Sequence, residues 1–274
     1  ARHTQHDFIA LVKKHGIAYY EKTLGQLFCE GARSAAKIVR MLLDECAAGG
    51  VDIRTGCAVG AVRKAERFRV ETSAGVFASD ALVIAAGGLS IPKLGASSFA
   101  FDIANQFGVA VIPARPGLVP LTFGEDDLAW MRLLSGVSAD VIVRCSSASF
   151  HEAALFTHRG LSGPAILQAS SYWCKGDNIA IDWLPEHPED VFCQRKRARP
   201  KAKLKSVLAG SLSDRLAASL AQQLVASLER TGQRPLAHAP DWPDAAVGDL
   251  KDTILVEIAR RLKNWTLTPM GAEG

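Results

Sequence analysis

The 274-residue sequence lacks any long uninterrupted run of apolar residues. Its longest such run, residues 81–86, is far shorter than the roughly 20 residues that a helix needs to cross a bilayer. No charged segment followed by an apolar one stands at the start, as it would in a secretory signal peptide. The sequence therefore predicts no membrane partner, and we expect a cytoplasmic protein.

The six cysteines lack the spacing of a zinc site or a redox pair. They stand at positions 29, 46, 57, 145, 174 and 193, with no C-x-x-C pair among them. Structural zinc sites usually place their ligands in closely spaced Cys or His pairs, so this spacing argues against a metal site. Scattered cysteines in a chain of this length are typical of reduced, mostly buried thiols in a cytosolic protein.

The sequence also has little excess of charge of either sign. Lys and Arg number 32 against 28 for Asp and Glu, a balance that suits an anionic ligand but does not indicate nucleic acid by itself. Seven basic residues do gather in the eleven positions from Arg195 to Lys205. Because no aromatic residue is interleaved with them, a solvated face is favoured over a nucleic-acid patch, which would show itself by salt-dependent binding. We expect no nucleic-acid partner.

Apolar residues make up 48% of the sequence, which is enough for one large or two ordinary folded domains. The spacing of apolar residues predicts a helix over 5–14, a short strand over 17–20 and a second helix over 32–48 that ends at two glycines. A buried strand is predicted over 51–54. This order is typical of the second half of a βαβ unit, so we expect a parallel sheet.

Short alternating segments follow at 59–64, 67–73 and 75–78 and predict a small antiparallel meander. The apolar run then predicts a strand over 80–86 that is buried on both faces and ends at Gly87 and Gly88. Glycine has no Cβ, so the backbone at such a pair can approach a ligand closely. A plain turn at the end of a strand is an equally good interpretation of the glycines alone.

Three prolines, Pro113, Pro116 and Pro120, fall within eight residues and are typical of a crossing between domains. Residues 118–182 then have a pattern of strands and turns with one short helix over 163–171, and residues 204–228 and 250–265 have helical spacing. A proline-containing connector is predicted over 234–243.

Several stretches resemble one family of proteins in the right order along the chain. The segment LVIAAGGLSIPKLG at 82–95 is similar to the ATGG signature of glutathione-reductase-like flavoproteins, and its continuation to residue 108 resembles the BaiN/YhiN-type branch, the bacterial aminoacetone oxidase family of FAD-binding proteins. Further matches are LGQLFC at 24–29, RPGLVPLTF at 115–123, LSGVS at 134–138, ALFTHRGLSGPAILQ at 154–168 and LTPMGAEG at 267–274. Together they cover nearly the whole chain.

The resemblance implies an α/β fold with an incomplete Rossmann-like FAD-binding domain at 1–113, an inserted β-plus-helical domain at 114–268, and a return to the first domain at 269–274. It implies an FAD-dependent oxidoreductase that transfers hydride through FAD, with NAD(P)H or oxygen as partner. The substrate implied is a small molecule, reduced at an enone-type double bond or oxidised at an amine. The cofactor-binding residues implied are Cys57, Ala58, Val59, Ala86, Gly87 and Gly88.

The strongest FAD fingerprint, GxGxxG, does not occur in these 274 residues. The chain begins without Met, and its ends look cut. We therefore expect the chain by itself to hold FAD poorly and to be inactive. The sequence also carries Ala86 and Phe101 where relatives tend to have Thr and Tyr. The lost hydroxyls leave open a second interpretation, a degenerate flavoprotein that acts as a binding or scaffold module.

The turn around His158 and Arg159 is a candidate substrate site, with the imidazole as proton donor and the guanidinium as an anion clamp. The competing interpretation is an ordinary surface turn. Ser162 does not fit the GxSxG elbow of a hydrolase, because Pro164 stands where the second glycine belongs. We expect Ser162 to be a helix N-cap, with Pro164 in the first turn. No residue is identified as catalytic.

Overall fold

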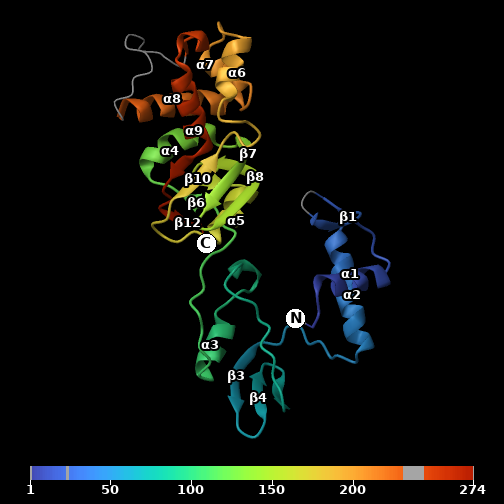
Figure 1. Ribbon diagram of the computed structural model, residues 1–274. Coiled ribbons are helices and arrows are strands. Elements are labelled where there is room, and N and C mark those ends of the chain that lie inside the picture. The colour runs from blue at the N-terminus through green and yellow to red at the C-terminus, as the bar shows by residue number, and fades with distance from the viewer. Residues whose placement is uncertain (1, 23–24, 231–243, 274) are drawn as a thin grey trace. The chain divides into compact units, whose positions relative to one another are not determined.

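The computed structural model describes residues 2–22, 25–230 and 244–273, and the chain folds as two compact units, Ala1–Ala85 and Ala86–Gly274 (Figure 1). The connector predicted at 234–243 lies outside the described residues. The domain boundary predicted near residue 113 stays a prediction. Among the residues that the structure describes, no helix is long and apolar enough to cross a membrane.

The first unit begins with two helices, α1 (Gln5–Lys14) and α2 (Ser34–Ala48), as the apolar spacing predicted. Thr4 caps α1 in a capping box, because its backbone N–H donates to the Asp7 carboxylate at 2.7 Å and its hydroxyl accepts from the backbone N–H of Asp7. Between the helices lies an antiparallel pair, β1 (Tyr19–Glu21) and β2 (Leu27–Cys29).

The predicted meander is confirmed. Strands β3 (Val59–Lys64), β4 (Phe68–Thr72) and β5 (Gly75–Ser79) form a three-stranded antiparallel sheet in that order. Val62 of β3 is buried.

The prediction of a parallel sheet with strands at 51–54 and 80–86 is wrong for the described part of the chain. Both segments are irregular, and every pairing between described strands is antiparallel. An apolar run becomes a buried parallel strand only when neighbouring strands satisfy its backbone on both sides, and no described residue does so here. Val83 is accordingly 84% exposed.

The second unit is built on a seven-stranded antiparallel sheet in the order β11-β10-β7-β8-β9-β6-β12 (Figure 1). The strands, in chain order, are β6 (Leu121–Thr122), β7 (Ser138–Cys145), β8 (Ala148–Thr157), β9 (Gly160–Ser162), β10 (Ile179–Asp182), β11 (Trp265–Leu267) and β12 (Gly271–Ala272).

The second unit also contains helices, and those from residue 125 onward share one hydrophobic core with the sheet. The helices are η2 (Pro92–Leu94), α3 (Phe99–Gln106), α4 (Glu125–Met131), η3 (Arg132–Leu134), α5 (Pro164–Ser170), α6 (Val191–Ala198), α7 (Leu204–Ala209), α8 (Asp214–Arg230), η5 (Val247–Asp249) and α9 (Asp252–Lys263). The helix predicted over 204–228 is interrupted at 210–213 and is two helices, and α4 was not predicted. The short helix α5 and the last helix α9 are confirmed.

The core of the second unit lies between the sheet and the helices from α4 onward. Phe156 of β8 stacks on Trp183 with ring centroids 5.6 Å apart, and Trp130 of α4 meets the edge of Phe156 at 5.7 Å. Offset or edge-to-face aromatic pairs of this kind add about 0.5–1.5 kcal/mol beyond the area they bury. This cluster fixes β8, and therefore the turn that follows it, against the rest of the unit.

Candidate functional site

The glycine pair after the apolar run stands at the beginning of the second unit. Gly87 has φ +72°, and no atom lies within 4 Å of the position that a Cβ would take. A Cβ on Gly88 would lie 4.0 Å from Cζ of Phe101 in α3. Within the described residues, no hydrogen bond uses the amides of Ala86, Gly87 or Gly88. Three open amides beside residues without bulky side chains fit the polar groups of a dinucleotide.

The other predicted cofactor contact, Cys57 to Val59, lies where the chain enters the meander of the first unit. The amide of Ala58 donates to the Ser73 hydroxyl at 3.0 Å, and its carbonyl accepts from the Ser73 amide at 2.9 Å. Val59 pairs with Thr72 across β3 and β4, and its side chain is 49% exposed. The amide and carbonyl of Ala58 are therefore already bonded to Ser73 and are not open to a ligand.

The structure places His158 and Arg159 in the tight turn that joins β8 to β9. The Thr157 hydroxyl holds the turn, because it donates to the Gly160 carbonyl at 3.2 Å and accepts from the Arg159 amide at 3.3 Å. Arg132 approaches the His158 carbonyl at 3.4 Å. The two predicted substrate residues therefore project from a turn whose backbone is fixed on both sides.

Charged side chains around this turn are paired. Arg159 forms an ion pair with Glu273 at 2.9 Å, although its side chain remains 63% exposed. Arg132 donates two hydrogen bonds to the Glu125 carboxylate at 2.8 and 2.9 Å, and these bonds lower the pKa of Glu125 from its usual value. An anion that binds at Arg159 would have to compete with Glu273.

The expected N-cap at Ser162 is wrong. Ser162 ends β9, Gly163 is the N-cap of α5 with φ +89°, and Pro164 is the first helical residue. A Cβ on Gly163 would lie 2.7 Å from the Ala153 carbonyl oxygen, so the chain enters the helix by pressing its backbone against β8. Only glycine permits that approach at that φ. The N-cap position therefore falls on Gly163, one residue after Ser162.

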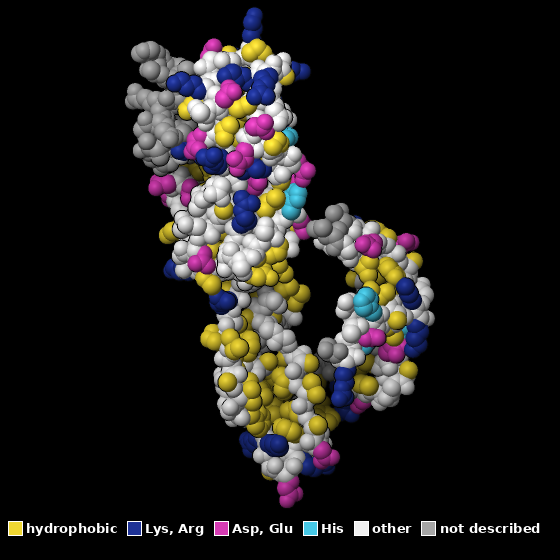
Figure 2. Space-filling view, viewed as in Figure 1, with side chains coloured by type: hydrophobic (Ala, Val, Ile, Leu, Met, Phe, Trp, Pro, Cys, Tyr) yellow, Lys and Arg dark blue, Asp and Glu magenta, His cyan; other side chains and the backbone are white. Residues whose placement is uncertain are grey.

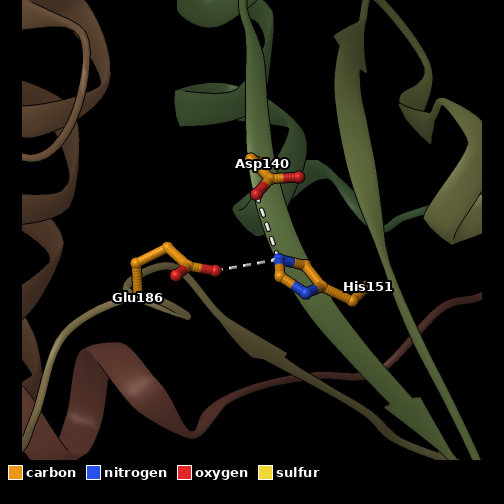
Figure 3. A group of neighbouring side chains, drawn as sticks. All are labelled: Asp140, His151 and Glu186. Carbon is orange, nitrogen blue, oxygen red and sulfur yellow. Dashed lines mark hydrogen bonds and ion pairs between the residues drawn. The ribbon is translucent and has the colours of Figure 1, made fainter. Parts of the chain in front are cut away.

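A cluster that the sequence did not reveal lies on β7, on β8 and in the loop after β10 (Figure 3). Nε2 of His151 lies 3.0 Å from Oδ2 of Asp140 and 3.7 Å from Oε1 of Glu186. A divalent cation with bonds of about 2.0–2.2 Å would hold its ligand atoms at similar separations. A protonated imidazole between two carboxylates gives the same spacing, and all three residues are exposed. The register of the β7–β8 hairpin brings Asp140 to His151, and the course of the loop after β10 brings Glu186 to both.

The six cysteine side chains differ in how far they are buried. All six cysteines are free, as expected, but the prediction that most are buried is wrong, because only Cys145 and Cys193 are. Burial raises the pKa of both thiols above the usual value, with a further contribution from Asp177 at Cys145 and from Asp252 at Cys193. Cys174 is exposed, and Nη1 of Arg115 donates to its sulfur at 3.0 Å.

Comparison with known proteins identifies the fold family. A family model described as "HI0933-like protein Rossmann domain" matches residues 1–247. The match confirms the predicted α/β, Rossmann-like fold class and supports an FAD-binding flavoprotein of the oxidoreductase type. It does not extend to the BaiN/YhiN-type branch or to NAD(P)H, and a cytoplasmic location stays a prediction.

Two curated relatives align with the whole of this chain. The "Ribosomal RNA dihydrouridine synthase" of Escherichia coli (strain K12) is 42% identical over 277 residues, and the protein of the same name from Haemophilus influenzae (strain ATCC 51907 / DSM 11121 / KW20 / Rd) is 37% identical over 289 residues. In both cases the chain spans 65% of the relative's length.

These names correct one prediction from the sequence. We expected no nucleic-acid partner, and that expectation is wrong, because both relatives are named for a reaction on ribosomal RNA. The lack of aromatic residues in the basic tract at 195–205 does not exclude a nucleic-acid partner. Aromatic side chains are needed to stack on unpaired bases, but contacts with phosphate groups do not require them.

Proposed function

The chain belongs to the HI0933-like family, and from this premise we propose that the full-length protein is an FAD-dependent oxidoreductase that reduces uridine in ribosomal RNA to dihydrouridine. The observation that carries the proposal is the alignment of the entire chain, at 42% and 37% identity, with two proteins named for that product. The chain spans 65% of their length, so the activity is proposed for the whole protein.

The reaction adds two hydrogens across the C5=C6 double bond of uracil. That bond is conjugated with the C4 carbonyl, so it is an enone-type double bond, and a hydride adds at C6 while a proton is delivered to C5. Bound FAD, once reduced, would supply the hydride, and we propose NAD(P)H as the electron donor. The protein must then hold the cofactor, position the base, supply the proton and exclude water.

We propose that the amides of Ala86, Gly87 and Gly88 bind polar groups of FAD. Their support is the left-handed conformation of Gly87 and the open space around its backbone. Cys57 and Val59 are proposed to pack against the cofactor through their side chains, since the backbone of Ala58 is bonded to Ser73.

We propose His158 as the proton donor and Arg159 as the group that holds a phosphate or the uracil carbonyl. A protonated imidazole can deliver a proton near neutral pH, and a guanidinium binds an anion through two parallel hydrogen bonds. The support is their adjacent position on a turn held by Thr157 and Arg132. When substrate binds, Arg159 would exchange its ion pair with Glu273 for the substrate anion.

The test uses the full-length protein and ribosomal RNA from cells that lack it. We expect a flavin absorbance spectrum that bleaches when NADH or NADPH is added without oxygen, and that returns when the RNA is added. Mass spectrometry of the digested RNA should then show new dihydrouridine. A protein whose flavin is reoxidised by oxygen or by a small enone, but which leaves the RNA unchanged, would contradict the RNA substrate. A colourless protein that does not bind added FAD would favour the scaffold alternative.

The same assay tests the roles proposed for His158 and Arg159. Replacement of His158 by Gln should lower the rate of dihydrouridine formation by about 10²–10⁴, the usual contribution of a general acid. Reduction of the flavin by NAD(P)H should be unchanged, because that step does not involve the uracil proton. Arg159→Lys keeps the charge but not the planar guanidinium, and we expect a raised KM for RNA with a smaller effect on kcat. If His158→Gln leaves the RNA reaction at the wild-type rate, His158 is not the donor.

A further inference from the structure

The basic tract at 195–205 contains two residues that hold the fold together. Nη1 of Arg195 donates to the Val207 carbonyl, and its Nη2 donates to the Ser211 hydroxyl at 2.6 Å. Lys196 donates to the Leu250 carbonyl at 2.6 Å and forms an ion pair with Asp252 at 2.8 Å. These two cations join α6 to α7 and to the beginning of α9, and they are not available to a ligand.

The other five basic residues of the tract form an exposed surface, which we call the basic edge: Arg197, Arg199, Lys201, Lys203 and Lys205. Arg197, Arg199 and Lys201 form no ion pair with any described residue. Lys203 and Lys205 share a single carboxylate, Asp244, at 2.9 and 2.6 Å. Their hydrogen bonds lower the pKa of Asp244 and keep it ionised. Among the ion pairs of the described residues, Asp244 is therefore the carboxylate that pairs with the basic edge.

The backbone beneath the basic edge is fixed. The loop between α6 and α7 pairs with the segment before η5, because the Gly248 amide donates to the Pro200 carbonyl at 2.8 Å and the Val247 amide donates to the Ala202 carbonyl at 2.8 Å. The Leu204 amide donates to the Ala245 carbonyl at 3.0 Å. Charges held on a fixed backbone lose less entropy when they bind a regular array of anions than charges on a free tail.

The surface beside this loop is hollowed. A depression of about 320 Å³ is lined by the tract residues Arg195, Ala198, Arg199 and Ala202 and by residues of α7. Lys and Arg side chains gather at the end of the second unit formed by α6 and α7 (Figure 2). Its lining combines the exposed cation Arg199 with the apolar side chains of Ala198, Ala202 and Val207, a combination that suits a ribose-phosphate segment.

We infer that the basic edge binds the phosphate backbone of ribosomal RNA, an inference that rests on the proposed function. The ligand chemistry follows from the contacts. Several unpaired guanidinium and ammonium groups on one fixed edge suit repeated phosphates, whereas the absence of aromatic residues from the tract argues against stacking on bases. The basic edge positions the RNA and does not select the uridine.

The test replaces Arg197, Arg199 and Lys201 by Gln in the full-length protein. Each phosphate contact contributes about 0.7–0.9 to the slope of log affinity against log salt concentration, so the loss of three should make the slope less negative by about 2 to 3. We expect affinity for a ribosomal RNA fragment to fall by at least about tenfold near physiological salt. In the dihydrouridine assay, KM for RNA should rise while kcat changes little.

The matched control removes the same charge elsewhere. Arg40, Lys175 and Arg260 are exposed residues outside the tract, and their replacement by Gln also lowers the net charge by three. This control should leave the salt slope nearly unchanged. A second variant, Arg197→Lys with Arg199→Lys, keeps the charge and should retain most of the affinity. Flavin absorbance and bleaching by NAD(P)H without RNA show whether each variant is folded.

The outcomes distinguish a failure of the proposed RNA-binding surface from a failure of the proposed reaction. If the wild-type protein binds the RNA fragment but forms no dihydrouridine, the proposed function fails, and the binding series still tests the basic edge. If the neutral triple variant keeps the wild-type salt slope, or if the control loses as much affinity, the inference is wrong. Binding of the wild-type protein to vesicles of anionic phospholipid, with no affinity for RNA, would overturn it in favour of a membrane surface.

Discussion

At the scale of single residues, two glycines mark the short strand that follows the turn with the candidate substrate residues: Gly160 begins β9, and Gly163 comes directly after it. Gly160 follows Arg159 directly, and a Cβ there would lie 2.3 Å from the Leu121 carbonyl oxygen. Gly163 directly follows the last residue of β9, and its Cβ would lie 2.7 Å from the Ala153 carbonyl oxygen of β8. Real Cβ contacts are not so short, so the sequence at 157–164 is set by close approach of backbone to backbone.

The contribution of close packing can be separated from that of backbone conformation. Gly163 and Gly136 have nearly the same φ, +89° and +84°, but a Cβ on Gly136 would meet no atom within 4 Å. Gly136→Ala should cost about 1 kcal/mol of stability, from the conformation alone. Gly163→Ala should cost about 3 kcal/mol or more, because the strands must also move apart. Denaturant unfolding measures both, and equal losses would show that the packing around Gly163 is looser than described.

The cysteines allow a second prediction at this scale. A raised pKa means that a smaller fraction of the thiol is thiolate at a given pH, so Cys145 and Cys193 should react slowly. Cys174 is exposed and should react first. A thiol-reactive disulfide reagent at pH 8, with and without denaturant, measures the rates, and Cys174→Ser should remove the fast phase. Rapid labelling of Cys145 in the folded protein would contradict the described burial.

At the scale of secondary-structure elements, a buried ion pair joins α9 to the end of β10. Nζ of Lys263 lies 3.0 Å from Oδ2 of Asp182 and donates to the Leu184 carbonyl at 2.7 Å. Oδ1 of Asp182 accepts from the Leu184 amide at 2.8 Å, and the carboxylate side chain is only 6% exposed. Both oxygens of this carboxylate therefore have partners, which is the condition under which a buried charge is tolerated.

Lys263→Met should destabilise the protein by about 3 kcal/mol, because it leaves the Asp182 carboxylate buried without a cation. Adding Asp182→Asn to that variant should restore part of the loss, since a neutral amide oxygen still accepts from the Leu184 amide. Thermal or denaturant unfolding of the two single variants and the double variant gives the coupling. If the double variant loses the sum of the two single losses, the two residues act independently and the ion pair contributes no stability.

The elements also show where local pattern suffices. The two N-terminal helices and the meander of the first unit follow from spacing that is satisfied within a few residues of chain. The apolar run at 80–86 has an equally clear pattern and yet forms no strand. A helix satisfies its own backbone, and a hairpin needs only its neighbour, but a parallel strand depends on partners distant in sequence.

At the scale of the whole molecule, the backbone amides that we propose to bind FAD lie in a segment that pairs with no described strand. The 274 residues contain no GxGxxG sequence, and the open amides at Ala86, Gly87 and Gly88 stand next to an unpaired segment. Few hydrogen bonds on an unsupported backbone give weak binding, because the ordering of that backbone costs free energy.

We therefore expect the 274-residue chain expressed alone to purify with far less than one flavin per molecule, and the full-length protein to purify yellow. The ratio of absorbance at the visible flavin maximum to absorbance at the protein maximum, measured on both proteins, gives the number of flavins per molecule. Circular dichroism of the shorter protein verifies that it is folded. A stoichiometric flavin in the shorter protein would show that its residues suffice for binding.

The sequence by itself determined the class of the fold, the short-range elements, the free state of the cysteines and the turn that carries His158 and Arg159. Each of these depends on neighbours along the chain or on a family pattern that extends over its whole length. The sequence also located the basic tract, but it could not separate Arg195 and Lys196, which bind the protein's own groups, from Arg197, Arg199 and Lys201, which face solvent.

Only the tertiary structure decided that division, because it depends on where the carbonyls of residues 207 and 250 and the carboxylate of Asp252 lie. The same holds for the cluster of Asp140, His151 and Glu186, which exists through the register of β7 with β8 and the course of the loop after β10. Register, long-range pairing and the choice of counter-ion are properties of packed elements. Residues far apart in the chain meet only after those elements have packed, and no local pattern records the meeting.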